Sequence, residues 1–381
     1  MKILFYLGIV GMILFEIANV YFIMPMPGSQ HIHSIDLAFC LYQLRWAFRG
    51  IFSVMIFLGL LPAFRVSPWI SSILLAFAII VGYLFNFEMA AEKMFLQPIS
   101  LSMADAKTNA VKPEKLVLGI EMNGQAKAYP IQFMGYHHQV TDTVGGAPVM
   151  VTYCTVCRTG RVFSPTVNGK AEQFRLVGMD HFNAMFEDLT TKSWWRQATG
   201  EAVAGPLKGT ALPELPSTQT SLQAWLDLYP NSLVMQRDDS FSAEYDSMDT
   251  YDLGFGRGKL TGTDTASWKD KSWVVGIALD QKTVKAFDWN RLKTERIIQE
   301  NIGSQPVILV LAADNSSFAA FKSPDPNAAF SFQNDTLRQG EKCWDLLGRA
   351  VNPGDGNLQK LSAYQEFWHS WRTFHPFTTR Y

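Results

Sequence analysis

Residues 118–163 read LGIEMNGQAKAYPIQFMGYHHQVTDTVGGAPVMVTYCTVCRTGRVF, and the chain contains this pattern twice. Residues 275–321, VGIALDQKTVKAFDWNRLKTERIIQENIGSQPVILVLAADNSSFAAF, align with it at a constant offset of 158 beyond one inserted residue. The alignment matches turn residues as well as apolar ones, since Gly145 falls on Gly303. Self-similarity of this kind predicts two copies of one structural unit.

The two copies also end alike. SWWRQATGEAVAG (193–205) recurs as KCWDLLGRAVNPG (342–354), and AWLDLYP (224–230) recurs as SWRTFHP (370–376). The likeness therefore extends through the whole unit and predicts tandem, divergent repeats.

Each unit has the pattern of a mainly β structure with some helix. Short apolar segments bounded by turn residues predict strands near 115–120, 126–130, 147–153 and 159–164, with a helix over 222–228. We therefore predict an α+β, mainly β fold, in which residues 95–236 form the first repeat and residues 271–381 the degenerate second. The polar, glycine-rich segment 237–270 is expected to be a connector that can fold over a site.

The first ninety residues are much more apolar than the rest. The runs Ile3–Met24, Ile51–Phe64 and Trp69–Phe87 predict about three transmembrane helices, the second being the shortest. No small-residue cleavage site follows the first run, which disfavours a signal peptide. Residues 1–90 are thus expected to form a membrane anchor whose partner is the lipid bilayer.

The basic residues near the ends of these runs do not decide the orientation. Lys2 and Arg65 lie on one side, and Arg45, Arg49 and Lys93 on the other. Three spans still place the two chain ends on opposite sides of the membrane. With a cytoplasmic N-terminus, we expect a multi-pass protein of the inner or cytoplasmic membrane with an extracytoplasmic, periplasmic soluble part.

The net charge and the cysteine content argue against two classes of protein, nucleic-acid-binding proteins and disulfide-stapled scaffolds. A net charge of -1 and a pI near 6.7 give no electrostatic reason to expect nucleic acid as a partner. The four cysteines are too few for a disulfide-stapled scaffold, and only Cys154 and Cys157 form a short-spaced pair.

The segment APVMVTYCTVCRTGRVFSP places Cys154 and Cys157 at the end of an apolar strand, in a tight turn closed by Gly160. In such a turn both thiolates can face one metal ion, and backbone N–H groups can lower the pKa of the thiols. A thioredoxin fold is disfavoured, because no helical pattern follows the pair. Arg158 is a candidate for stabilising a thiolate or binding an anion, or else forms a surface salt bridge.

The second copy serves as an internal control for the cysteines. Ala312 and Asn315 stand where the first copy has Cys154 and Cys157, so the chemistry is confined to the first copy. The loss also argues that the unit does not need the pair in order to fold. A closed zinc site of four cysteines shared between the copies is excluded.

Two histidines of the first copy are lost together with the cysteines. Glu295 and Arg296 stand opposite His137 and His138. Adjacent side chains on a strand point to opposite faces, so at most one of these histidines is expected to join the thiols, with the other on the surface.

His181 is a further candidate ligand or acid/base group. It is expected to begin a helix that Asp180 caps. The tryptophans Trp194, Trp195 and Trp225 are expected in the core.

At YCTVC, at the preceding AYPIQFMGYHHQVTDTVGGAPVMVTYC and at the following WWRQATGEAVAGPLKGTALPELP, the sequence resembles the bacterial family catalogued as domain of unknown function 3179. The resemblance covers about residues 115–381, and family members likewise have a weaker second copy. Residues 153–157 match the family's Tyr-Cys-Pro-Leu-Cys, while His138 replaces the Glu of its His-Glu pair. Some members are described as selenoproteins and many are exported, which implies a reactive chalcogen outside the cytoplasm.

The leading hypothesis is a membrane-anchored, extracytoplasmic thiol-dependent protein, possessing redox or detoxification chemistry at Cys154 and Cys157. His137 and Arg158 would help to lower the pKa of the thiol that attacks. The enzyme would then be a thiol-based oxidoreductase that acts on an unknown small molecule or thiol.

Two alternatives remain open. The first is a soft-metal module that binds copper or zinc with side chains from Cys154, Cys157, His137, His138 and His181. The second is a membrane-tethered interaction scaffold that binds a peptide or protein partner through its β-rich body.

Overall fold

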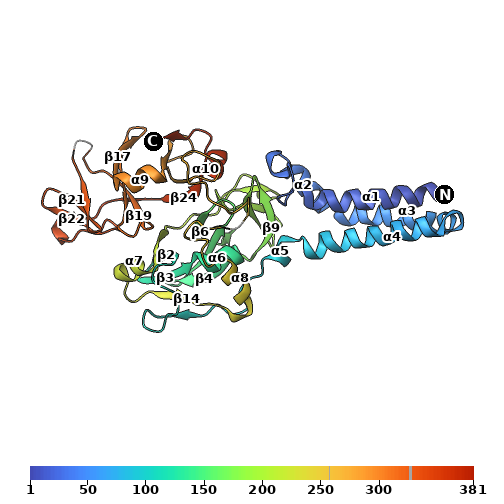
Figure 1. Cartoon of the computed structure of the whole chain (residues 1–381), viewed down its shortest axis with the longest axis horizontal. Helices are drawn as coiled ribbons and strands as arrows, with labels where there is room; N and C mark the ends of the chain where they lie inside the picture. Colours follow the sequence, from blue (N-terminus) through green and yellow to red (C-terminus); the bar gives the residue numbers. More distant parts are fainter. Residues whose placement is uncertain (257, 326–327) are drawn as a thin grey trace. The chain divides into compact units, whose positions relative to one another are not determined.

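The chain is described by a computed structural model that covers residues 1–256, 258–325 and 328–381 (Figure 1). It forms two compact units. The anchor unit comprises Met1–Leu96, Glu172–Arg196 and Glu201–Ala211, and the β unit comprises Gln97–Ala171, Gln197–Gly200 and Leu212–Tyr381. Most of the segment 172–211, which the sequence pattern assigns to the first repeat, therefore groups with the N-terminal helices.

The anchor unit begins with apolar helices. Its helical elements are α1 (Lys2–Tyr21), η1 (Ser29–His31), α2 (Ile35–Gln43), α3 (Arg45–Val66), α4 (Pro68–Tyr83), η2 (Leu84–Glu88) and α5 (Ala91–Met94). Three helical segments are long and apolar enough to cross a membrane: Lys2–Tyr21, Arg45–Val66 and Pro68–Glu88. The second segment is the longest rather than the shortest, because the helix of 22 residues begins at Arg45, six residues before the predicted run Ile51–Phe64.

A buried carboxylate joins the apolar helices. Glu16 of α1 accepts hydrogen bonds from Arg49 of α3 at 2.7 and 2.9 Å, and from Asn86 of η2 at 2.9 Å. A charge inside an apolar bundle is stable only when it is paired in this way. Glu16 therefore has a helix-packing role.

A four-stranded antiparallel sheet completes the anchor unit. Its order is β12 (Ala202–Ala204), β11 (Trp194–Arg196), β10 (Asn183–Asp188) and β9 (Phe174–Asp180). Met179 on β9 donates its backbone N–H to the Ile23 carbonyl at 2.7 Å, and Trp194 is buried in the same apolar cluster as Ile23.

The predicted helix at His181 is wrong. His181 and Phe182 form the turn between β9 and β10, with φ values of 50° and 66°. The Asp180 carboxylate contacts the His181 ring and the Arg196 guanidinium, and so it does not serve as a helix cap.

The first half of the β unit, residues 97–171, 197–200 and 212–236, contains two main sheets. The larger has the order β1 (Met103–Ala104), β14 (Leu233–Met235), β3 (Gln125–Pro130), β2 (Leu116–Met122) and β13 (Thr218–Ser221). The smaller has the order β4 (Gln139–Val144), β5 (Ala147–Cys154) and β6 (Thr159–Phe163), and a short hairpin pairs β7 (Thr166–Val167) with β8 (Lys170–Ala171). Helix α6 (Ile131–His137) links the two sheets, and α7 (Leu222–Leu228) follows β13. The predicted strands and the predicted helix over 222–228 are confirmed.

The second half of the β unit, residues 271–381, has its elements in a similar order. One sheet runs β24 (Ala363–Phe367), β15 (Trp273–Ala278), β16 (Val284–Asp288) and β25 (Thr379–Arg380). The next runs β17 (Ile297–Ile302), β18 (Gln305–Leu311), β19 (Phe318–Lys322) and β23 (Lys360–Leu361). The remaining elements are α9 (Trp289–Glu295), α10 (Trp368–Phe374), η4 (Pro353–Asp355) and the small sheet of β20 (Ser331–Gln333), β21 (Thr336–Gln339) and β22 (Lys342–Trp344).

Each half packs one tryptophan against one glycine. A Cβ at Gly119 of β2 would overlap the indole ring of Trp225 on α7. A Cβ at Gly276 of β15 would overlap the indole ring of Trp371 on α10 in the same way. The absence of a side chain at these two strand positions is therefore what lets each helix lie on its sheet.

We expect Gly119→Ala to lower the free energy of unfolding by about 1–3 kcal/mol, because the added methyl overpacks the Trp225 site. Gly354→Ala is the matched control, since a Cβ there meets no atom within 4 Å. It should change stability by no more than about 0.5 kcal/mol. Denaturant unfolding of the purified full chain, followed by tryptophan fluorescence, measures both. Equal stability of the two variants would contradict this packing account.

Candidate functional site

The two cysteines lie in one buried turn. Strand β5 ends at Cys154 and strand β6 begins at Thr159, as the sequence predicts, and we call residues 154–159 the thiol turn. Cys154 is 1% exposed and Cys157 is 0% exposed. Both are thiols in this structure rather than a disulfide. The turn therefore presents a dithiol that is shielded from solvent.

Burial dominates the ionisation of the Cys157 thiol. Desolvation raises its pKa well above the ordinary value of 9.0, and a hydrogen bond with the Cys154 thiol and the charges of Cys154 and Glu366 raise it further. A hydrogen bond with Ser370 acts in the opposite direction. The lowering expected from the backbone N–H groups is thus outweighed, and Cys157 is protonated at neutral pH.

Arg158 is a structural anchor for the connector rather than a surface residue. It is buried, and its guanidinium donates to the carbonyls of Tyr251 at 2.9 Å and Asp252 at 2.5 Å. The same group lies 3.7 Å from the ring centroid of Trp273. The alternative of a surface salt bridge is therefore wrong, because the connector covers this side chain.

The connector folds over the thiol turn. It contains η3 (Asp239–Phe241) and α8 (Ser242–Ser247), and the Tyr251 hydroxyl donates to the Thr155 carbonyl at 2.7 Å. Together with the two bonds from Arg158, this contact holds residues 251–252 against the turn.

Two basic side chains that no sequence motif indicated also border the turn. Lys271 Nζ donates to the carbonyls of Val156 at 2.7 Å and Leu260 at 2.6 Å. His369 Nε2 lies 3.1 Å from the Val156 carbonyl and 3.2 Å from Lys271 Nζ.

The charges of these two side chains are set by burial. Burial lowers the pKa of Lys271, while the charges of Cys157 and Cys154 act to raise it. Burial, followed by the charge of Lys271, lowers the pKa of His369 to about 4. His369 is therefore a neutral imidazole at neutral pH.

The second half of the β unit closes the site from another side. Phe367 donates its N–H to the Cys157 carbonyl at 2.8 Å. Next to it, Arg161 Nη2 lies 3.2 Å from the Glu366 carboxylate, and both side chains are almost fully buried. Burial raises the pKa of Glu366, and the Arg161 charge opposes this shift.

His137 and His138 lie together in the interior. His137 is the last residue of α6, and His138 follows it with φ of 62°, so the assumption that these two histidines are neighbours on a strand is wrong. Both are buried, which also corrects the expected surface position of one of them. His137 Nε2 is 2.5 Å from the Tyr245 hydroxyl, and the His138 carbonyl accepts from Tyr153 N–H at 2.9 Å. Burial lowers the pKa of His138 to about 4.

His181 belongs to the anchor unit, whereas the thiol turn belongs to the β unit. Its Nδ1 is 2.5 Å from the Asp180 carboxylate, and its ring centroid is 4.7 Å from that of His33. Across residues 1–256, 258–325 and 328–381, no group of three or more His, Cys, Asp or Glu side chains is arranged to hold a metal ion.

The corresponding turn of the second half closes without thiols. Ala312 donates its N–H to the Ser317 carbonyl at 2.8 Å, and Asn315 has φ of 59°. A turn of this length between two strands therefore forms without either sulfur.

The raised pKa of Cys157 makes stability dependent on alkaline pH. Because the unfolded chain loses this proton near pH 9.0 and the folded chain keeps it, the stabilisation is complete below pH 9.0 and is lost as the pH rises. We expect Cys157→Ala to flatten the fall in unfolding free energy above pH 9 by up to about 1.4 kcal/mol per pH unit.

Denaturant unfolding between about pH 8 and 10.5 measures this slope. Cys40→Ala, which removes an exposed thiol, should leave it unchanged. A Cys157→Ala variant with the slope of the unchanged chain would contradict the assignment.

Comparison with known proteins adds a family match. The model of the family described as "Protein of unknown function (DUF3179)" matches residues 97–378, which include the thiol turn and both halves of the β unit. No curated protein matches the chain, and no solved structure matches it.

Proposed function

Because the chain belongs to the DUF3179 family, whose description assigns no activity, we propose a function from the chemistry of the thiol turn. We propose a membrane-anchored thiol oxidoreductase in which Cys154 and Cys157 form a dithiol/disulfide couple. The observation that carries this proposal is that the two buried thiols share one turn and a hydrogen bond. Two sulfurs placed in this way can exchange two electrons with an external disulfide.

We also propose that residues 95–236 and 271–381 are two tandem copies of one unit, of which only the first has chemistry. The tryptophan–glycine contacts and the order of the main sheets support this interpretation. Ala312 and Asn315 show that the turn closes without sulfur. The thiols of the first copy therefore need a role other than holding the turn.

The proposed reaction is a thiol–disulfide exchange, in which the electrons and protons that the protein loses are gained by the external disulfide. The thiolate of one cysteine attacks a sulfur of an external disulfide, forms a mixed disulfide and releases one thiolate. The second cysteine then attacks the protein sulfur of the mixed disulfide, forms the Cys154–Cys157 bond and releases the second thiolate. The protein loses two electrons and two protons, and the external disulfide becomes two thiols.

One neighbouring basic group, Lys271, suits the deprotonation step. His369 is neutral, and with a pKa of about 4 it is too weak a base to take the proton from a thiol. Lys271 places a positive charge beside the turn, where it favours a thiolate over a thiol. The charge interaction between Lys271 and Cys157 opposes the desolvation that raises the pKa of Cys157.

Access to the sulfurs requires displacement of the connector. The contacts that hold it are the Tyr251 hydroxyl on Thr155 and the Arg158 guanidinium on two connector carbonyls. We propose that the pair reacts from a state in which these bonds are open. The closed state then protects the dithiol from unselective oxidation.

The same proposal places the β unit outside the cytoplasm. Three apolar helices long enough to cross a membrane would place the N-terminus and the β unit on opposite sides. An extracytoplasmic position supplies the oxidising surroundings in which a dithiol/disulfide couple operates.

Oxidised glutathione is the probe for this function. The purified, reduced full chain is incubated with it, denatured and alkylated, and peptide masses report the state of Cys154 and Cys157. We expect both to lose their thiols together as an internal disulfide that dithiothreitol reverses. Cys154→Ser and Cys157→Ser should instead each retain one glutathione on the remaining cysteine.

Lys271→Met tests the local electrostatics. We expect exchange to slow by roughly tenfold, which corresponds to about one unit in thiol pKa. Lys269→Met removes an exposed lysine two residues away and should react at the unchanged rate.

Equal rates for the two lysine variants would contradict the role of Lys271 in lowering the thiol pKa. Two further results would contradict the oxidoreductase itself. A stoichiometric copper or zinc ion that is lost in Cys157→Ser would favour the metal-binding module. Thiols that react with glutathione only after unfolding would favour the interaction scaffold.

A further inference from the structure

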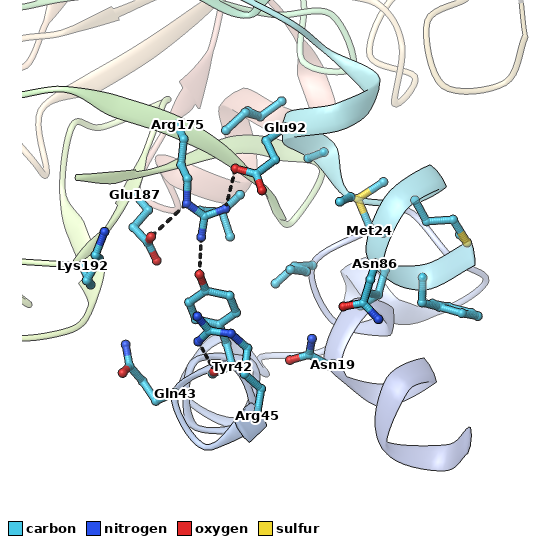
Figure 2. Close-up of a pocket in the computed structure, with 18 of the residues that line it drawn as sticks. Asn19, Met24, Tyr42, Gln43, Arg45, Asn86, Glu92, Arg175, Glu187 and Lys192 are labelled. Atoms are coloured by element: carbon cyan, nitrogen blue, oxygen red, sulfur yellow. Dashed lines mark hydrogen bonds and ion pairs between the residues drawn. The ribbon is translucent and has the colours of Figure 1, made fainter. Parts of the chain in front are cut away.

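The anchor unit contains a cavity of about 440 Å³ that the thiol chemistry does not use (Figure 2). Its walls come from the ends of the apolar helices and from β9 and β10. The polar side chains that line it include Tyr42, Arg45, Arg49, Asn86, Arg175 and Lys192.

The cavity lies at one end of the apolar helical segments. Asn19 belongs to the last turn of α1, Arg45 begins α3, and Asn86 belongs to η2 after α4. In a chain that crosses the membrane three times, these three positions share one membrane boundary. The cavity would thus open where acyl chains meet lipid headgroups.

Most of the charges around the cavity are already paired. Arg175 donates to Glu187 at 2.9 Å and to Glu92 at 3.1 Å, and a third nitrogen donates to the Tyr42 hydroxyl (Figure 2). Arg49 is paired with Glu16 through two hydrogen bonds. These groups form the rigid frame of the site.

Two cations of the lining have no carboxylate partner in the part of the chain that the structure describes. Arg45 donates to the Tyr42 carbonyl at 2.6 Å, and its guanidinium lies 3.9 Å from the centroid of the Tyr42 ring. Lys192 forms no ion pair among the described residues and has an exposed side chain. The cavity therefore has an excess of positive charge beside the membrane boundary.

Apolar side chains form the remaining wall. Ile23, Met24 and Phe85 line the cavity together with the cations. A water-soluble phosphate would meet the same cations but would leave these side chains uncovered. A lipid with a phosphate headgroup matches both parts of the wall.

We propose that this cavity binds the phosphate headgroup of an anionic lipid, with Arg45 and Lys192 as the residues that contact the phosphate. The upper part of the acyl chains would lie against Ile23, Met24 and Phe85. This site is independent of the thiol turn and would hold the anchor unit at a fixed depth in the bilayer.

Native mass spectrometry of the full chain in detergent tests the proposal. The probes are dioleoyl phosphatidylglycerol, dioleoyl phosphatidylcholine and glycerol 3-phosphate. We expect selective retention of phosphatidylglycerol, and a fall of roughly tenfold or more in its apparent affinity in the double variant Arg45→Gln, Lys192→Gln. The double variant Lys2→Gln, Arg65→Gln is the matched control. It removes two positive charges from α1 and α3 at the helix ends that lie away from the cavity.

The arms of the experiment separate the possible outcomes. Equal lipid retention by both double variants, or equal retention of the two lipids, would overturn the proposal. Displacement of the lipid by glycerol 3-phosphate at similar concentration would assign the cavity to a soluble anion instead. Unchanged reaction of Cys154 and Cys157 with glutathione in the Arg45, Lys192 variant would show that the two sites are separate.

Discussion

The buried ion pair between Arg161 and Glu366 fixes how the two halves of the β unit meet. The two groups lie 3.2 Å apart with almost no exposure, and a buried charge is tolerated only beside its partner. Glu366 is followed by Phe367, whose N–H bonds the Cys157 carbonyl. The same contact that joins the halves therefore positions the thiol turn, and removal of either charge would leave the other buried without compensation.

Burial determines the protonation state of the Cys157 thiol in the thiol turn. Desolvation keeps the Cys157 thiol protonated, while Lys271 supplies a nearby positive charge and His369 a neutral imidazole. In the proposed oxidoreductase, a pair with these neighbours is inert while the connector is closed and becomes reactive when water and an external disulfide enter. In the proposed enzyme, the reactivity of the two thiols is therefore controlled by their exposure to solvent and not by a permanently activated thiolate.

The anchor unit combines apolar helices with a sheet that the chain adds much later. Met179 on β9 bonds the carbonyl of Ile23, and Arg175 on the same strand frames the cavity beside the helix ends. The proposed lipid would therefore contact helices and sheet together. The anchor would then do more than tether the chain, because its lipid would help to order residues 172–196.

The sequence by itself determined most strands of the first repeat, one helix and the position of the dithiol, but not the turn at His181 or helix α6. Strand Ala147–Cys154 and helix Leu222–Leu228 follow from apolar periodicity and turn residues, which act over neighbouring positions. The burial of His138 and the placement of Lys271 and His369 at the turn were decided only by tertiary structure. The contacts of Lys271 and His369 join segments more than a hundred residues apart. Whether a polar side chain faces water or a partner is set by the element that packs over it rather than by its neighbours in the chain.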